Sequence, residues 1–241
     1  HALNGLARLE RGQKILIHSA TGGTGRALLS MARWKGARVF ATAGNEAKRK
    51  LLRKLGVEQV ADSRGLGFVD AFKPATAEEG FDVICNTLTG DAIEANLSLM
   101  APYGHYLELS KRDILDNNRL SLGAFARNLS FHAIDVVHMV RHAPERAGRM
   151  LREAIALVDQ GAVEVLPHTV YPVEKASDAF RLMAQSRHTG KIVLSFEETA
   201  TSTVRGTRPR PVTIHADGTY LITGGAGGIG GRLALWLADQ G

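Results

Sequence analysis

Short apolar runs recur along the chain, separated by segments in which apolar residues have a helical spacing. The runs lie at residues 15–17 (ILI), 38–42 (RVFAT), 59–61 (QVA), 81–85 (FDVIC), 103–109 (YGHYLEL) and 129–134 (LSFHAI). Segments between them, such as 27–34 and 46–55, place apolar residues three or four positions apart, which predicts helices. Buried strands that alternate with helices are typical of an α/β fold. We therefore predict a doubly wound parallel sheet of the Rossmann type.

The alternation of strands and helices continues beyond this sheet. Its further elements are a helix at 144–160, a strand near 168–171, a helix at 175–186 and a strand at 191–196. The helix at 144–160 begins at Pro144 and stops at Gly161. Proline favours the start of a helix and glycine favours its end. The apolar stripe of this helix consists of Met150, Leu151, Ile155, Ala156 and Val158. We expect this stripe to pack in the core.

The composition changes to Thr, Arg and Pro with few apolar residues over 197–217, which predicts a linker. The opening pattern then returns: residues 219–223 (TYLIT) read as a strand, 224–230 as a glycine turn and 232–238 as the beginning of a helix. The predicted organisation is a Rossmann part at 1–161, a return segment at 162–196, the linker, and the start of a second nucleotide-binding domain at 218–241.

The turn between the first strand and the first helix is rich in glycine. Gly22, Gly23 and Gly25 fall there, within the sequence ATGGTGRALL. Glycine lets the backbone turn sharply from strand to helix, and it lets backbone amides approach a phosphate at the positive end of the helix. The G-x-G-x-x-G fingerprint is incomplete, because its last position is Leu28. An ordinary turn is the alternative, but the flanking strand and helix favour a pyrophosphate site.

Composition and charge exclude several classes of protein. The chain has 241 residues and a formal net charge of +6, but no recognisable nucleic-acid motif. No apolar run is long enough to cross a bilayer, and the N-terminus lacks a secretory signal. Cys85 is the single cysteine, which rules out an internal disulfide and fits a reducing compartment. We expect a cytoplasmic protein that binds neither nucleic acid nor membrane. Since His1 stands where a start methionine would, we expect a piece of a longer polypeptide.

The end of the second strand predicts which nicotinamide cofactor is bound. In NAD sites an acidic residue at this place binds the ribose 2′-hydroxyl, whereas a basic residue accommodates the 2′-phosphate of NADP. Here the strand ends in Thr42, Ala43 and Gly44 without an acid, and Lys48 follows. Lys48 is the first candidate for the 2′-phosphate, and Arg64 is the second. A solvated helix face is the alternative for either residue, but the missing acid and the basic residues Lys48, Arg49 and Lys50 together favour NADPH.

Ionisable side chains follow two later strands, at the edge of the sheet where ligands gather. Lys111 follows the fifth strand and Asp135 the sixth, so we expect them to converge. A lysine can donate a proton there while a carboxylate orients it. Asp113 is the less favoured carboxylate, and a surface salt bridge is the alternative for the pair. His188 and Lys191 flank Gly190 in a turn, where they either touch cofactor or face solvent.

Several motifs together resemble one family. They are KILIHSATGGTG at the cofactor turn, CNTLTGD after the fourth strand, LELSKRDI after the fifth and FRLMAQSRHTGKIVLSF at the close. The chain resembles the enoylreductase domains of modular polyketide synthases and animal-type fatty acid synthases, in the medium-chain dehydrogenase/reductase superfamily. Mycobacterial lipid-synthesising polyketide synthases are the most similar members. The tail TYLITGGAGGIG resembles the opening of the ketoreductase domain that follows in such synthases.

This resemblance implies hydride transfer from NADPH to the β-carbon of an α,β-unsaturated thioester on acyl carrier protein, and protonation of the α-carbon. It implies Lys111 and Asp135 as the proton-donating pair, other synthase domains as partners, and a homodimer. The expected cofactor contacts are Thr21, Gly22, Gly23, Thr24, Gly25, Thr42, Lys48, Arg64, Asn86 and Leu88. The family's turn is GGVG followed by an apolar residue, whereas Thr24 and Arg26 stand here. The family's N-terminal substrate-binding half is absent, so catalysis by this chain alone is not implied.

Two other functions compete with this one. A Rossmann-like module without catalysis could serve as a dimer or docking surface in a megasynthase, and a failure to bind nucleotide would favour it. A zinc-dependent alcohol dehydrogenase shares the fold. However, one cysteine cannot make a structural site of several cysteines, and the histidines show no ligand spacing. We therefore expect no metal.

Overall fold

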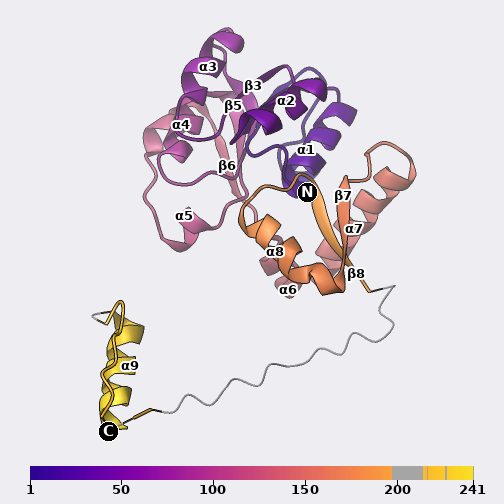
Figure 1. Cartoon of the computed structure of the whole chain (residues 1–241). Helices are drawn as coiled ribbons and strands as arrows, with labels where there is room; N and C mark the ends of the chain where they lie inside the picture. Colours follow the sequence, from indigo (N-terminus) through magenta and orange to yellow (C-terminus); the bar gives the residue numbers. More distant parts are fainter. Residues whose placement is uncertain (197–213, 216, 226, 241) are drawn as a thin grey trace. The chain divides into compact units, whose positions relative to one another are not determined.

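The computed structural model of the chain describes residues 1–196, 214–215, 217–225 and 227–240. The chain divides into two compact units, His1–Glu198 and Thr199–Gly241 (Figure 1). Among the described residues, no helix is both long enough and apolar enough to cross a membrane.

A six-stranded parallel sheet forms the centre of the first unit. Its strands are β1 (Lys14–Ile17), β2 (Arg38–Ala43), β3 (Gln59–Asp62), β4 (Phe81–Asn86), β5 (Met100–Glu108) and β6 (Ser130–Ala133). Their order in the sheet is β3-β2-β1-β4-β5-β6, and all neighbours pair in parallel. The order reverses between β1 and β4, which is where a doubly wound sheet leaves a crevice for ligands at the carboxyl ends of its strands. The predicted fold class is confirmed.

Helices cover both faces of this sheet (Figure 1). η1 (Ala2–Leu6), α1 (Gly23–Trp34) and α2 (Glu46–Lys54) pack in one core, and α3 (Phe68–Ala75), α4 (Ala92–Ser98) and η2 (Leu122–Arg127) pack in the other. The short helix α5 (Arg112–Leu115) follows β5, and α6 (Val136–His142) and α7 (Pro144–Asp159), which contact each other, follow β6. Alternate residues of β1 enter different cores: Ile15 and Ile17 pack with α1 and α2, and Leu16 packs with α3 and α4. Strands buried on both faces read as continuous apolar runs, which explains why the sequence predicted them. Helix α4 ends at Ser98, and Met100 already pairs with Phe81 in the sheet.

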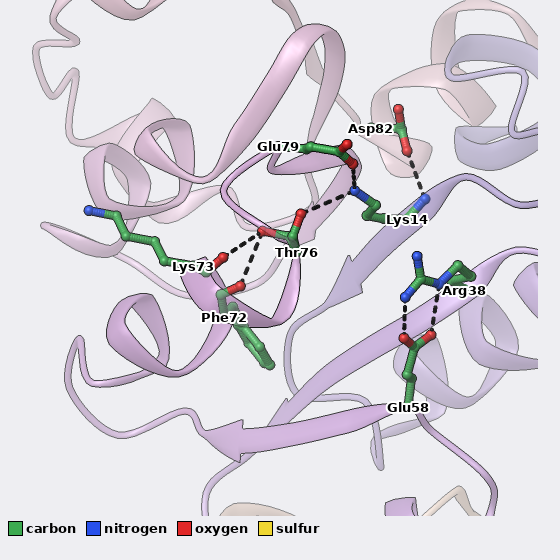
Figure 2. Close-up of polar contacts among 8 residues, drawn as sticks. All are labelled: Lys14, Arg38, Glu58, Phe72, Lys73, Thr76, Glu79 and Asp82. Atoms are coloured by element: carbon green, nitrogen blue, oxygen red, sulfur yellow. Dashed lines mark hydrogen bonds and ion pairs between the residues drawn. The ribbon is translucent and has the colours of Figure 1, made fainter.

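Polar contacts join the amino ends of the strands, opposite to the ligand edge. Figure 2 shows Lys14 at the start of β1 reaching toward the segment that precedes β4. The Lys14 ammonium donates to the Thr76 carbonyl oxygen at 3.3 Å and forms an ion pair with Glu79, and the Lys14 amide donates to Asp82 Oδ2 at 2.7 Å. Arg38 pairs with Glu58 beside them. The Lys14 contacts thus tie the start of β1 to β4 and the segment before it, and the Arg38–Glu58 pair ties the start of β2 to the residue before β3.

The return segment forms a small parallel pair of strands. Its elements are β7 (His168–Pro172), η3 (Val173–Lys175), α8 (Ala176–Ala184) and β8 (Lys191–Ser195). The expected burial of the α7 stripe is wrong: that helix has no buried residue, and Leu151 and Ile155 are 61% and 50% exposed. The helix period correctly marked an apolar face, but the described residues leave that face only partly covered.

The second unit contains α9 (Gly228–Asp239), which begins earlier than the predicted start at 232. The strand expected at 219–223 is wrong, since the described residues of that segment are irregular and then turn. A strand needs a partner for its backbone groups, and this short unit offers none among its described residues. The predicted linker 197–217 lies almost wholly outside the described residues, and the predicted domain boundaries remain predictions.

Candidate cofactor and proton-transfer site

The glycine turn after β1 leads directly into α1. Gly22 is the residue that caps α1, and no side chain caps that end of the helix. The first backbone amides of a helix have no partner within it, so this end presents amide donors and positive potential to an anion. Thr24 is exposed in the first helical turn. The turn therefore has the form expected of a phosphate cradle.

Gly25 explains why the turn needs glycine. A Cβ atom on Gly25 would lie 2.5 Å from Ala20 Cα and 2.6 Å from the Ser19 carbonyl oxygen. Real Cβ atoms do not approach backbone this closely, so the first turn of α1 packs on the loop just after β1 only because the side chain is missing. The incomplete fingerprint does not loosen this contact, because Leu28 is itself buried against the core.

The return segment lies on the glycine turn. The Gly190 amide donates to the Thr21 carbonyl oxygen at 3.0 Å. A Cβ on Gly23 would lie 2.6 Å from Lys191 Cε and 2.7 Å from its Nζ, so the Lys191 ammonium covers the turn. Gly190 has φ +71°, and a Cβ there would lie 2.1 Å from the Pro167 carbonyl oxygen, which no other residue tolerates. Of the two alternatives left open by the sequence, Lys191 thus faces the turn.

Lys48 lies at the start of α2, beside the same return segment. Asn45 caps this helix by accepting a hydrogen bond from the Lys48 amide at 2.9 Å. The Lys48 ammonium donates to the Ser186 carbonyl oxygen at 2.7 Å, and partial burial lowers the pKa of Lys48. A cavity of about 410 Å³ opens here, lined by Asn45, Ala47, Lys48, Leu51, Arg187 and Thr189. Sequence reasoning missed Arg187, because only the packing of the return segment brings it to this cavity.

Arg64 lies near the end of β2, against the backbone of the loop that follows. A Cβ on Gly44 would lie 3.5 Å from Arg64 Nε. Asp62 lies two residues before Arg64, and its pKa is lowered by a hydrogen bond from the Arg64 amide and by Arg49, which contacts it at 2.7 Å. Arg49 thus neutralises the Asp62 carboxylate, which lies beside Ala43 at the end of β2.

Three of the expected cofactor residues point into the protein instead. Thr42 Oγ1 is buried 2.9 Å from His18 Nδ1. Asn86 is fully buried and uses its side chain to bond the backbone of Leu88 and the Glu108 carboxyl. Leu88 is partly buried against the α3 and α4 core. The side chains of Thr42 and Asn86 therefore form hydrogen bonds inside the protein and do not face the edge of the sheet where a ligand would bind.

Lys111 and Asp135 come together as expected, although 24 residues separate them. Lys111 Nζ lies 2.5 Å from Asp135 Oδ1, and their side chains are 43% and 42% exposed. Asp135 also caps α6 by accepting a hydrogen bond from the His138 amide at 2.9 Å. The hydrogen bond from Lys111, followed by that from His138, lowers the pKa of Asp135. The carboxylate stays charged and holds the ammonium at the carboxyl ends of β5 and β6.

Asp113, the less favoured carboxylate, has a different task. It is buried and accepts hydrogen bonds from the Gly90 amide at 3.0 Å and from Asn118 Nδ2 at 2.7 Å. It therefore holds the loop after β4 against the segment after β5. The geometry separates the two aspartates that the sequence left as alternatives.

Taken together, one edge of the sheet carries an anion cradle, cationic side chains around it and an ammonium–carboxylate pair. This arrangement suits a phosphate-bearing cofactor and a proton transfer near its reactive end. Residues 55–194 match the profile of the family described as zinc-binding dehydrogenase. The chain belongs to this dehydrogenase family. Its fold is accordingly that of a nicotinamide-dependent oxidoreductase.

Relatives within the family are polyketide synthases. The chain is 42% identical over 241 residues to a phenolphthiocerol/phthiocerol polyketide synthase of Mycobacterium tuberculosis, and 42% identical over 239 residues to a mycocerosic acid synthase-like polyketide synthase of Mycolicibacterium smegmatis. These matches cover 100% and 99% of the chain but only 11% of each synthase. The dehydrogenase chain thus corresponds to one segment of much longer proteins.

Solved structures point to the same segment. The nucleotide-binding subdomain of the enoylreductase domain of PpsC from Mycobacterium tuberculosis is 41% identical, with a TM-score of 0.66, over 69% of this chain and 93% of that one. The CurF ER cyclopropanase from the curacin A pathway is 31% identical, with a TM-score of 0.73, over 80% of this chain and 58% of that one. This dehydrogenase chain is therefore homologous to nucleotide-binding subdomains of polyketide synthase enoylreductases.

Zinc does not fit the residues present, despite the name of the family. Within the described ranges, no three His, Cys, Asp or Glu side chains come together in a way that could hold a metal ion. Cys85 is buried within β4, where burial raises the pKa of its thiol well above the usual range. A thiol held neutral in a core is a poor metal ligand.

Proposed function

We propose that this chain is the NADPH-binding part of a polyketide synthase enoylreductase. The observation that carries the proposal is the pairing of Lys111 with Asp135 at 2.5 Å, at the same edge of the sheet as the glycine turn. A cofactor fold alone would be compatible with many reactions. A lysine held by a carboxylate at this edge favours a reaction that needs a proton near the nicotinamide.

The residues present fit the cofactor. Glycines at the turn leave space that a Cβ would fill, and His188 Nδ1 and Thr87 Oγ1 are buried without a hydrogen-bond partner among the described residues. We infer that Gly22, Gly23, Thr24 and Gly25 bind the pyrophosphate through backbone amides, with Lys191 above them. We further infer that Lys48 and Arg187, with Arg64 nearby, bind the 2′-phosphate. The absence of an acid at the end of β2 supports NADPH over NADH.

Bound NADPH would supply the hydride that reduces the β-carbon of an α,β-unsaturated thioester. Lys111 would donate the proton that the α-carbon then receives, and Asp135 would orient the ammonium and hold its charge. General acid catalysis of this kind contributes about 10²–10⁴ in rate. Removing the donor should therefore slow turnover strongly without abolishing hydride transfer.

The partners follow from the same proposal. The thioester would be carried by the phosphopantetheine arm of an acyl carrier protein, and the other synthase domains would supply the substrate and take the product. A homodimer and a cytoplasmic location complete it. The buried, unpaired Cys85 supports a reducing compartment.

The test is the NADPH-dependent reduction of a crotonyl thioester by the complete enoylreductase that contains this chain. Lys111→Ala and Asp135→Asn should each reduce kcat by about 10²–10⁴ while leaving the Kd for NADPH within about threefold. Arg112→Ala is the matched control, since Arg112 is an adjacent exposed cation whose ion-pair partner is Asp116. Wild-type turnover in both site variants would overturn the assignment of Lys111 and Asp135. A protein that binds no nucleotide would instead be a noncatalytic module.

A further inference from the structure

Glu108, the last residue of β5, carries a carboxyl group that the proposed reaction does not use. The residue is 1% exposed. Three donors reach its oxygens: the Ser110 amide lies 2.8 Å from Oε1, while Asn86 Nδ2 at 2.8 Å and the Tyr106 hydroxyl at 3.2 Å approach Oε2. A buried carboxyl with only donors around it acts as an acceptor, so these contacts suit the carboxylate form.

Burial nevertheless raises the pKa of Glu108, and hydrogen bonds from Asn86, Ser110 and Tyr106 offset this only in part. A carboxylate at this position therefore costs the fold desolvation free energy. A leucine or methionine at this position would avoid this desolvation cost. The buried carboxyl group of Glu108 therefore calls for a role beyond packing.

The partners of Glu108 come from two different loops of the ligand edge. Ser110 directly precedes Lys111 in the chain. The Asn86 side chain holds the other loop. Its Nδ2 donates to the Leu88 carbonyl oxygen at 2.8 Å, and its Oδ1 accepts from the Leu88 backbone amide at 3.0 Å. One carboxyl group therefore fastens the loop after β4 to the residue before Lys111.

The connection extends across the sheet. Asn96 Nδ2 donates to Asn86 Oδ1 at 3.1 Å, and Asn96 Oδ1 lies 2.7 Å from His18 Nε2. His18 in turn contacts Thr42 at the end of β2. A buried chain of hydrogen bonds thus runs from Thr42, at the end of β2, to the Ser110 amide, next to the proposed proton donor Lys111.

We propose that Glu108 is a positioning residue: its carboxylate joins the loop after β4 to the Ser110 amide and thereby sets where Lys111 stands relative to the bound cofactor. The proposal rests on the enoylreductase function proposed above. A displacement of about 1 Å in a reacting group can lower a rate by 10²-fold. Loss of the contacts from Glu108 to Asn86 and Ser110, which join the two loops, should consequently appear in kcat and not in binding.

The test compares Glu108→Gln with Tyr106→Phe in the complete enoylreductase. Gln keeps the size of the side chain but replaces one acceptor oxygen with an NH₂ donor. That donor then faces either the Ser110 amide or Asn86 Nδ2, so one hydrogen bond to a loop is lost. Tyr106→Phe removes the one donor that belongs to neither loop and keeps the ring stacked 5.2 Å from Phe131. We expect Glu108→Gln to lower kcat by about 10–100-fold with KM and the Kd for NADPH within threefold. Tyr106→Phe should stay near wild type.

Amide hydrogen exchange provides a readout that a merely stabilising residue would not give. Ser110 and Leu88 amides should exchange at least tenfold faster in Glu108→Gln, while amides in the centres of β1 and β4 stay protected. Glu108→Asp, which keeps the carboxyl group but shortens the side chain, should lose the bond from either the Ser110 amide or Asn86 Nδ2 and lower kcat less. The Glu108→Asp variant tests the proposal by the same two measurements if the Glu108→Gln variant does not fold.

Unchanged kcat together with unchanged exchange at Ser110 would overturn the proposal. General loss of protection across the sheet, with KM and kcat changing alike, would do the same, because Glu108 would then only stabilise the fold. If the wild type reduces no thioester, the proposed function fails by itself. Exchange at Ser110 and Leu88 then still decides whether Glu108 fastens the two loops.

Discussion

The ammonium of Lys48 donates a hydrogen bond to the carbonyl oxygen of Ser186 at 2.7 Å, although 138 residues separate them. A lysine at the start of α2 is thereby held at the loop that carries Arg187. The contact uses one of three ammonium donors, and the others remain available to the adjoining cavity. The predicted 2′-phosphate site thus combines the Rossmann sheet with the return segment.

Lys48→Ala should weaken NADPH binding by about 10–100-fold, the size of effect expected from a lost charge-assisted hydrogen bond. NADH, which lacks the 2′-phosphate, should bind as before. Isothermal titration with both cofactors measures the difference. Lys50→Ala is the matched control, because Lys50 is an exposed lysine on the same helix. Equal losses for NADPH and NADH would contradict the assignment of Lys48.

Lys191→Met should weaken both cofactors to the same degree, roughly tenfold. Its ammonium covers Gly23 in the turn, so its expected partner is the pyrophosphate that NADPH and NADH share. Fluorescence titration with each cofactor gives the two dissociation constants. A change confined to NADPH would place Lys191 at the 2′-phosphate instead.

Gly25→Ala should destabilise the fold by roughly 1–3 kcal/mol or more, since the added methyl group meets backbone atoms that cannot move aside. Gly22→Ala is the matched control in the same turn. There a Cβ would lie 3.5 Å from its nearest neighbour, the Ser19 carbonyl oxygen, which is an ordinary contact. Urea unfolding of both variants measures the difference. Equal stabilities would show that the close approach at Gly25 is not required.

Stability should depend on pH through His18. Burial lowers the pKa of His18 from 6.5 to about 4 in the folded chain. Between these values the unfolded chain binds a proton that the folded chain does not, so the free energy of unfolding falls as the pH is lowered. The decrease should reach about 3 kcal/mol near pH 4. Urea unfolding at several pH values checks this, and His18→Gln should have a shallower slope. Identical slopes would exclude His18 as the source.

Lys14→Met should lower the free energy of unfolding by about 1 kcal/mol, because the side chain is only 13% exposed and loses the Thr76 carbonyl and Glu79. Arg38→Met should cost less, since both partners of the Arg38–Glu58 pair are more than 40% exposed. Thermal unfolding ranks the two variants. Neither should alter NADPH binding, as both lie at the amino ends of the strands; a loss of affinity would contradict this separation.

The sheet could be predicted from sequence because its strands are buried on both faces. Leu16 packs on one side and Ile17 on the other, which leaves a continuous apolar run that periodicity detects. The convergence of Lys111 and Asp135 was predictable for a related reason. Each follows a strand, and the carboxyl ends of parallel strands share one edge.

Other features depended on packing between distant segments. Nothing near Arg187 indicates that its loop lies beside α2, and nothing near Lys191 indicates Gly23 as its neighbour. Thr42 follows the rule for a cofactor contact, yet its hydroxyl turns inward because buried His18 needs a partner. The α7 stripe has the period of a buried helix, but burial also requires a covering surface, which the local sequence does not reveal.

The return segment meets the Rossmann sheet at the glycine turn, through the bond from Gly190 to Thr21 and the Lys191 side chain above Gly23. A dinucleotide in this turn would touch both parts at once and act as a non-covalent cross-link. By mass action, whatever binds only the joined arrangement stabilises that arrangement. Occupancy of the cofactor site would then govern how often the β7–β8 pair opens from the sheet, and with it how readily a protease cuts between α7 and β8.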